Sequence, residues 1–126
     1  MPIGSDTHAY RQRLPHLVKR DRTYYVTFCT RDREVLSPAA RDVVLATCMA
    51  LHDVLCWFDS VVVMPDHVHL IAVPFDSTNT ATVVGRVKGR SAYDINRQLA
   101  RGGPLWQRDS FDRIVRSDEN LQKKRD

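Results

Sequence analysis

Two histidines one residue apart, His67 and His69, are the side chains whose types and spacing best fit metal chemistry. They begin an apolar segment, residues 67–73, that follows the turn-forming triplet at 64–66 (MPD). Side chains on a strand alternate between its two faces, so the histidines project together and Val68 points the other way. With a rise of about 3.3 Å per residue, their Cα atoms lie roughly 6.5–7 Å apart. Two imidazoles at that separation can bind one divalent ion.

The residues alone leave two interpretations of this pair open. Two strand histidines can be ordinary half-buried side chains. The flanking residues, however, are almost wholly apolar. Burying two imidazoles among them costs free energy unless something satisfies their polar atoms, which favours a metal. Asp66 likewise either completes the turn, since Pro-Asp is a common turn pair, or adds a carboxylate to the ion.

The neighbouring segments predict the elements that position the pair. Residues 23–30 are rich in β-formers and predict a strand, and a Ser-Pro pair starts a helix over 38–57. The histidines belong to a hairpin over 60–73. A second helix over 81–100 ends at a Gly-Gly-Pro sequence, and a last strand follows over 105–115.

The order of these elements predicts the fold. Strand, helix, strand, strand, helix, strand is the split β-α-β order of the ferredoxin-like α+β class, an antiparallel sheet with helices on one face. Residues 1–22 are polar and predict a basic N-terminal arm, and residues 23–126 a single domain. Residues 118–125 carry acids at their start and predict the first turns of a third helix, cut short at Asp126.

Composition narrows the class of protein. A chain of 126 residues with 43% hydrophobic and 27% charged residues suits one globular domain. No apolar run approaches the roughly 18–20 residues that span a bilayer, and the N-terminus lacks a signal-peptide pattern. Three cysteines without CxxC spacing favour a reducing compartment and packing roles: Cys29, Cys48 and Cys56. We therefore expect a cytoplasmic protein with no membrane contact.

Positive charge is clustered along the chain. The net charge is +4, and cations concentrate within residues 11–33 and 86–101. Such clusters are the electrostatic footprint of a phosphate-backbone binder, although a merely solvated basic surface is the alternative. The candidate DNA contacts in these clusters are Arg11, Arg13, Arg20, Arg22, Arg86, Lys88, Arg90, Arg97 and Arg101.

Aromatic side chains accompany these cations. Helical spacing places Tyr93 within a basic stripe of the second helix, opposite its apolar side. Trp106 is either a core residue or a platform on which a nucleic-acid base stacks. Gln107 and Arg108 follow it and complete the candidate DNA contacts.

Three blocks, taken together and in this order, resemble a known family. The strand TYYVTFCTRDR, the hairpin VVVMPDHVHLIAVP and the block GPLWQRDSFDRIVRSDENL resemble the IS200-type transposases, and more closely the REP-associated tyrosine transposases of bacteria. The N-terminal RLPH fits the same subgroup. The resemblance covers nearly the whole chain.

The resemblance implies a chemistry. Enzymes of this family cut and rejoin single-stranded DNA beside short hairpins. His67 and His69 would hold Mg²⁺ or Mn²⁺, and a tyrosine would form a 5′-phosphotyrosine link. In the family this tyrosine and a third ligand, Asn or Gln, follow the block matching residues 117–125, so their positions fall beyond Asp126. Tyr93 is then the remaining candidate nucleophile, though the family's second helix does not carry it.

Three hypotheses follow for the chain, as monomer or homodimer. The first is a transposase that cleaves single-stranded DNA through a metal and a tyrosine. The second is a truncated, catalytically dead member that acts at most as a nucleic-acid-binding module. The third is an unstable remnant without a biochemical role.

Overall fold

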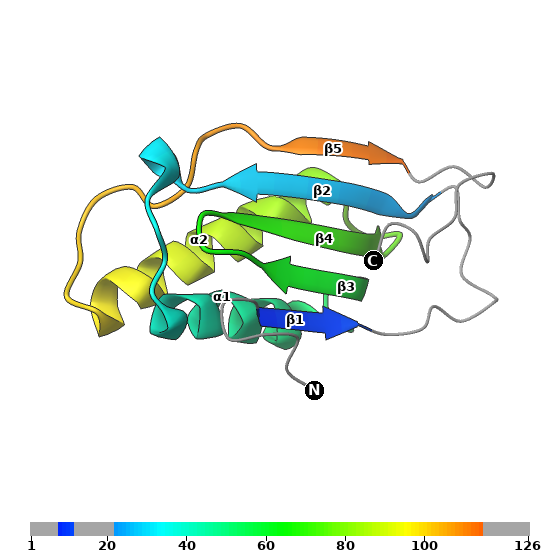
Figure 1. The fold of residues 1–126 in the computed structure, drawn as a ribbon. Coiled ribbons are helices and arrows are strands. Elements are labelled where there is room, and N and C mark those ends of the chain that lie inside the picture. Colours follow the sequence, from blue (N-terminus) through cyan, green and yellow to red (C-terminus); the bar gives the residue numbers. More distant parts are fainter. Residues whose placement is uncertain (1–7, 12–21, 115–126) are drawn as a thin grey trace.

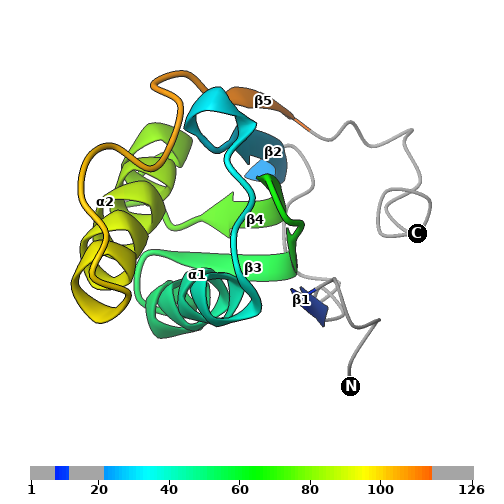
Figure 2. The same cartoon turned by 60° about the vertical axis from the view of Figure 1, so that its left-hand side comes forward.

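The computed structural model of the chain describes residues 8–11 and 22–114. Within them, five strands form one sheet in the order β1-β3-β4-β2-β5, and every neighbouring pair is antiparallel. Both helices lie on one side of this sheet, and its other side faces away from them (Figures 1 and 2). The elements are β1 (His8–Arg11), β2 (Tyr24–Cys29), α1 (Pro38–Leu51), β3 (Cys56–Val63), β4 (His67–Pro74), α2 (Thr80–Gln98) and β5 (Phe111–Ile114).

The predicted α+β class and element order are confirmed. From β2 to β5 the chain runs strand, helix, strand, strand, helix, strand. The sheet order β3-β4-β2-β5 is the ferredoxin-like arrangement that this order predicts. We therefore find the histidine strand, β4, in the middle of the sheet.

The N-terminal arm is a partial exception to the prediction. Residues 1–22 were expected to be irregular, but His8–Arg11 pairs with Ser60–Val63 as the edge strand β1. The pairing satisfies backbone groups of β3 that would otherwise form a sheet edge. Four residues with little apolar alternation carry no local strand signal, so only the partner strand reveals this one.

Helix α1 starts as predicted and ends earlier. The Ser37 hydroxyl accepts the amide N–H of Ala40 at 3.1 Å and caps the helix. The helix ends at Leu51 instead of residue 57 because His52 leaves the helical conformation and its Nδ1 accepts the Phe58 amide at 2.9 Å. The following residues then turn into β3 at Cys56.

The C-terminal elements are shorter than the sequence suggests. Helix α2 is capped by Asn79 and runs to Gln98, close to the expected 81–100. The last strand was expected over 105–115 but is interrupted: Trp106 forms an isolated antiparallel bridge with Thr30, and the strand itself covers only Phe111–Ile114. The predicted third helix at 118–125 lies outside the described residues.

The core lies between the sheet and the helices. Alternate residues of β2 and β4, among them Phe28 and Leu70, pack against the buried sides of α1 and α2. Cys48 and Cys56 are fully buried there, and burial raises the pKa of the Cys56 thiol to about 12, so both act as packing residues. No described helix is long and apolar enough to cross a membrane.

Candidate metal and DNA site on the open face of the sheet

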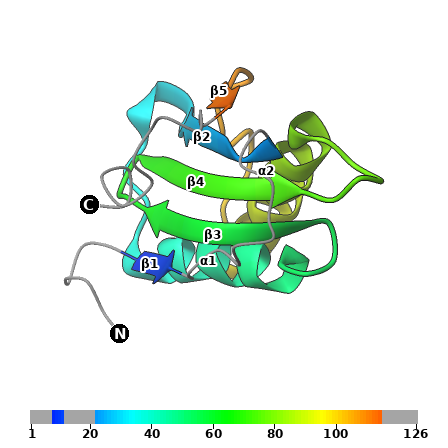
Figure 3. The same cartoon turned by 90° about the vertical axis from the view of Figure 1, so that its right-hand side faces the viewer.

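The histidine pair lies on the sheet face that the helices leave uncovered. In the register of β2 and β4, His67 is opposite Cys29 and His69 is opposite Thr27. Val68 is completely buried in the core, so its two neighbours point to the other face. Their ring centroids are 4.7 Å apart and the rings are nearly perpendicular, at 84°. The shared orientation that the spacing predicts is therefore confirmed. Figure 3 views the sheet from this side, with β3 and β4 in front of the helices.

Each imidazole is held through its Nδ1 atom. His67 Nδ1 lies 2.8 Å from the Asp66 carboxylate. His69 Nδ1 lies 3.0 Å from the Thr27 hydroxyl and 3.2 Å from the Tyr25 hydroxyl, which can accept its proton. Metal-binding histidines characteristically donate one ring N–H to such a partner, which leaves the other nitrogen for the ion. Both Nε2 atoms are therefore the candidate ligands.

Asp66 contributes more than a turn. Its backbone carbonyl accepts the Thr30 amide at 2.9 Å, in keeping with the turn role that its place after Pro65 predicts. Its carboxylate also receives Arg33 Nη2 at 3.0 Å. The hydrogen bond with His67, and then that with Arg33, lower the pKa of Asp66. The carboxylate is thus held as an anion at His67 Nδ1, where it orients the ring.

His69 favours the protonation state that metal binding requires. Burial, and then the positive charge that His67 can carry, lower the pKa of His69 and favour its neutral form. Among the residues that the structure describes, no group of three or more His, Cys, Asp and Glu side chains forms a metal cluster. The donor set fits an ion with two nitrogen ligands and its other positions open to phosphate oxygens and water. An ion held there would polarise a bound phosphate.

Tyr25, Thr27 and Arg33 are site residues that the sequence analysis did not select. Tyr25 and Thr27 alternate along β2, so a period-two pattern places them on one face with Cys29. This alternation can be seen in the sequence, but the register that places Tyr25 and Thr27 beside His69 of β4 cannot. Arg33 reaches Asp66 from the turn after β2, across 33 positions of sequence, and carries no local signal.

Trp106 is a core residue and does not offer a stacking surface. Its side chain is 8% exposed, and its indole N–H donates to the Ser91 hydroxyl at 3.0 Å. Its ring meets Phe28 edge-to-face, with centroids 4.9 Å apart. Of the two roles that the sequence left open for Trp106, the structure therefore shows the core residue.

Lys88, Gln107 and Arg101 hold the loop between α2 and β5. Lys88 Nζ donates to the carbonyl oxygen of Gln107 at 2.9 Å and lies 5.5 Å from the centre of the Phe28 ring. Burial lowers the pKa of Lys88. The Gln107 amide donates to the Thr30 carbonyl, and Arg101 pairs with Glu34. The structure thus gives these three side chains contacts within the chain, and their DNA contacts stay a prediction.

The basic stripe of α2 lies on the opposite layer from the histidines. Its side chains are exposed on the outer side of the helix: Arg86, Arg90, Tyr93 and Arg97. Arg90 also pairs with Asp94 at 2.9 Å. Tyr93 is 59% exposed there, and the whole sheet separates it from His67 and His69. Tyr93 is therefore excluded as a nucleophile at this histidine pair within the same chain.

The remaining predicted contacts are spread over the molecule. Arg11 belongs to the edge strand β1, whereas Arg13 and Arg20 lie outside the described residues. Arg22 pairs with Asp76. Arg108 is exposed and lines a hollow of about 340 Å³ beside the start of α2. Of the two whose side chains the structure describes, Arg22 and Arg108, neither lies at the histidine pair.

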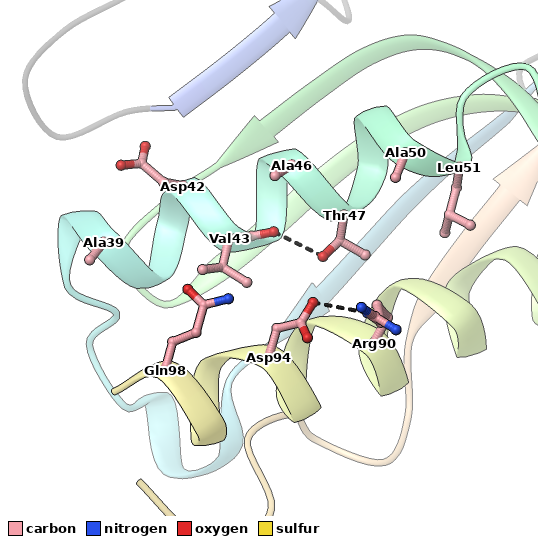
Figure 4. A pocket seen from close by; sticks show the side chains of 10 residues that line it. All are labelled: Ala39, Asp42, Val43, Ala46, Thr47, Ala50, Leu51, Arg90, Asp94 and Gln98. Atoms are coloured by element: carbon pink, nitrogen blue, oxygen red, sulfur yellow. Dashed lines mark hydrogen bonds and ion pairs between the residues drawn. The ribbon is translucent and has the colours of Figure 1, made fainter. Parts of the chain in front are cut away.

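A groove of about 500 Å³ runs between α1 and α2. Figure 4 shows Val43 and Thr47 of α1 pointing toward the Arg90–Asp94 ion pair of α2. Its lining contains neither histidine nor cysteine. The groove lies in the helical layer, apart from the candidate metal ligands.

We expect Asp66→Asn to weaken Mn²⁺ binding by about 10- to 100-fold, the range typical for loss of a carboxylate behind a ligating histidine. The amide cannot hold the His67 proton as an anion does. Isothermal titration calorimetry with Mn²⁺ alone measures the change. Asp42→Asn is the control, because Asp42 is an exposed residue of α1 in the other layer of the molecule. An affinity equal to that of the unmodified chain would show that Asp66 serves the turn alone.

Known proteins resemble this chain in both sequence and fold. The family model described as IS200-like transposase matches residues 18–122. No curated protein sequence matches the chain. A REP-associated tyrosine transposase, solved bound to a REP hairpin, shares the fold with a TM-score of 0.68 and 14% identity, over 90% of this chain and 68% of that one. A candidate transposase from Deinococcus radiodurans shares the fold with a TM-score of 0.61 and 20% identity, over 90% of this chain and 92% of that one. Because the family model spans most of the chain, the chain belongs to the IS200-like transposase family.

Proposed function

We propose that this transposase chain binds a DNA hairpin and its adjoining single strand, with the strand's phosphate at a Mg²⁺ or Mn²⁺ ion on His67 and His69. The observation that carries the proposal is the arrangement of the two rings. Both face the uncovered side of the sheet, and both are held through Nδ1. The hairpin-bound REP-associated transposase, which shares the fold, supports DNA of this form as the ligand.

The reaction we propose is strand cutting and rejoining. A tyrosine oxygen replaces the 3′ oxygen on the phosphorus, which gives a 5′-phosphotyrosine and a free 3′-hydroxyl. The number of phosphoester bonds is unchanged, so rejoining needs no other energy source. His67 and His69 orient the phosphate for in-line attack, and Tyr25 and Thr27 keep the His69 ring in place.

The position of the tyrosines favours a second candidate function, a DNA-binding module without cleavage. Tyr93 lies on the far layer, and Tyr25 already contacts His69 through its hydroxyl. Tyr24 packs against the core. A chain that depends on these three would bind DNA without forming a covalent link.

A covalent-adduct assay separates the two functions. The chain is incubated with Mn²⁺ and an end-labelled single strand carrying a hairpin, then analysed on a denaturing gel. An adduct that is absent in His67→Ala supports cutting, and peptide mapping identifies the tyrosine. Hairpin binding in a gel-shift experiment without any adduct supports the binding module. Absence of both adduct and binding contradicts the proposed function.

The basic stripe of α2 gives a prediction for DNA affinity. We propose that its arginines contact phosphates of the hairpin stem. The salt dependence of DNA binding should then be less steep in the double variant Arg86→Gln/Arg97→Gln. The negative slope of log K against log salt concentration should decrease in magnitude by about 1.8, or about 0.9 for each lost duplex phosphate contact. Fluorescence anisotropy with a labelled hairpin across a salt series measures it. Gln98→Ala, exposed on the same helix, should leave the slope unchanged. An unaltered slope in the double variant would make the stripe an ordinary solvated surface.

A further inference from the structure

Phe111 is an exposed aromatic residue in the same row of the sheet as the histidine pair. Its side chain is 61% exposed on the edge strand β5. Thr27 of β2 pairs with Phe111 on one side and with His69 on the other. Directly paired residues of neighbouring strands project to the same face. Phe111, Thr27 and His69 therefore form one row across β5, β2 and β4, on the sheet face that the helices leave uncovered; the three strands lie side by side in Figure 1.

The side chains of β5 point alternately to the two faces of the sheet, and this alternation confirms the orientation of Phe111. Asp112 is paired with Val26, a core residue that faces the helices, and it lines the hollow beside the start of α2. Its neighbours Phe111 and Arg113 therefore point to the opposite face. With strands about 4.8 Å apart, the Cα atoms of Phe111 and His69 are separated by roughly 10 Å, a span that one nucleotide can bridge.

A cation and a second aromatic ring accompany Phe111 on this face. The Arg113 guanidinium lies 5.7 Å from the centre of the Tyr25 ring. The Tyr25 hydroxyl in turn contacts His69, so this group continues to the candidate metal ligands. Aromatic rings beside basic side chains are the recurrent platform for single-stranded nucleic acids, because a base stacks on the ring while the cation meets the backbone.

We propose that Phe111 is a stacking platform for a nucleobase of the single strand whose phosphate lies at His67 and His69. The proposal rests on the proposed function and deepens it by naming a base-binding position. It assigns to Phe111 the role that the sequence analysis considered for Trp106. The difference between the two rings is exposure: Phe111 presents its ring to solvent, whereas Trp106 is closed within the core.

The test compares two replacements of Phe111. Phe111→Leu keeps an apolar side chain but removes the flat ring, and Phe111→Tyr keeps the ring. Base–aromatic stacking of about 1–3 kcal/mol predicts that the leucine variant binds a single-stranded oligonucleotide about 5- to 150-fold more weakly. The tyrosine variant should bind like the unmodified chain. Ile114→Ala, on the same strand but on the helical face, is the matched control.

Abasic oligonucleotides locate the base. Anisotropy is measured with a set of strands, each lacking one base near the hairpin. At one position, removal of the base should weaken binding to the unmodified chain but leave binding to Phe111→Leu unchanged, since the two changes remove the same contact. Such coupling is not expected of a residue that only packs within the protein.

The outcomes separate this inference from the proposed function. If the unmodified chain binds the strand and Phe111→Leu binds equally well, the stacking platform is refuted and the proposed function stands. If the leucine variant instead loses self-association in sedimentation experiments, with DNA affinity per chain unchanged, Phe111 is a contact between copies. If the unmodified chain binds no single strand, both proposals fail.

Discussion

Replacing His69 with alanine is expected to abolish specific Mn²⁺ binding. The change removes one of the two nitrogen ligands, so the loss should exceed the roughly 10- to 100-fold effect typical of residues behind the ligands. Calorimetric titration of the purified chain with Mn²⁺ measures it directly, without DNA or activity. Metal-dependent adduct formation, where the unmodified chain shows it, should disappear in parallel.

Two comparisons make this result specific. Tyr93→Phe, on the far layer, should bind Mn²⁺ like the unmodified chain. His67→Ala should show a loss similar to that of His69→Ala, because the centroids of the two rings are only 4.7 Å apart and each ring would supply one ligand. Retention of full Mn²⁺ affinity by either histidine variant would overturn the proposed metal site.

The second large effect concerns stability. Trp106→Ala should lower the free energy of unfolding by about 3–5 kcal/mol, the usual cost of removing a buried aromatic side chain. Domains of this kind are stable by only about 5–15 kcal/mol, so the variant should lose a large part of its stability. Urea denaturation followed by circular dichroism measures the change.

The contacts of Trp106 suggest a second, smaller test. Ser91→Ala removes the hydroxyl that accepts the indole N–H and should cost about 1–3 kcal/mol, because a buried donor is left unsatisfied. Phe111→Ala, an exposed aromatic in the same C-terminal part of the chain, should change stability by no more than about 0.5 kcal/mol. A Trp106→Ala variant as stable as Phe111→Ala would contradict the burial of Trp106.

Local patterns in the sequence were sufficient for the order of the elements from β2 to β5 and for the shared orientation of the histidine pair. Period-two alternation placed His67 and His69 on one face, and the Ser37 cap located the start of α1. The order of strands and helices predicted the ferredoxin-like sheet. These features depend on residues within a few positions of one another, where steric alternation and capping act, so one sequence can reveal them.

Contacts between distant segments decided where α1 ends, whether β1 forms and which residues surround the histidines. The end of α1 depends on the hydrogen bond from Phe58 to His52, and β1 exists through its pairing with β3. The partners of the histidines come from β2 and from the turn that follows it. Strand register over such separations is set by packing of the whole sheet, which a local pattern does not encode.

The predicted DNA contacts likewise depended partly on local sequence and partly on the tertiary structure. Charge clustering selected Lys88, Arg101 and the α2 stripe together, because in sequence they are equivalent cations on one helical segment. In the tertiary structure Lys88 and Arg101 bind carbonyl groups and a glutamate of the same chain, and the α2 stripe lies on the layer away from the histidines. It likewise buries Trp106 and exposes Phe111. By itself the sequence determined which chemical groups the chain carries; only the packing of two layers decided which of them face the same side, since burial and desolvation arise from the fold as a whole.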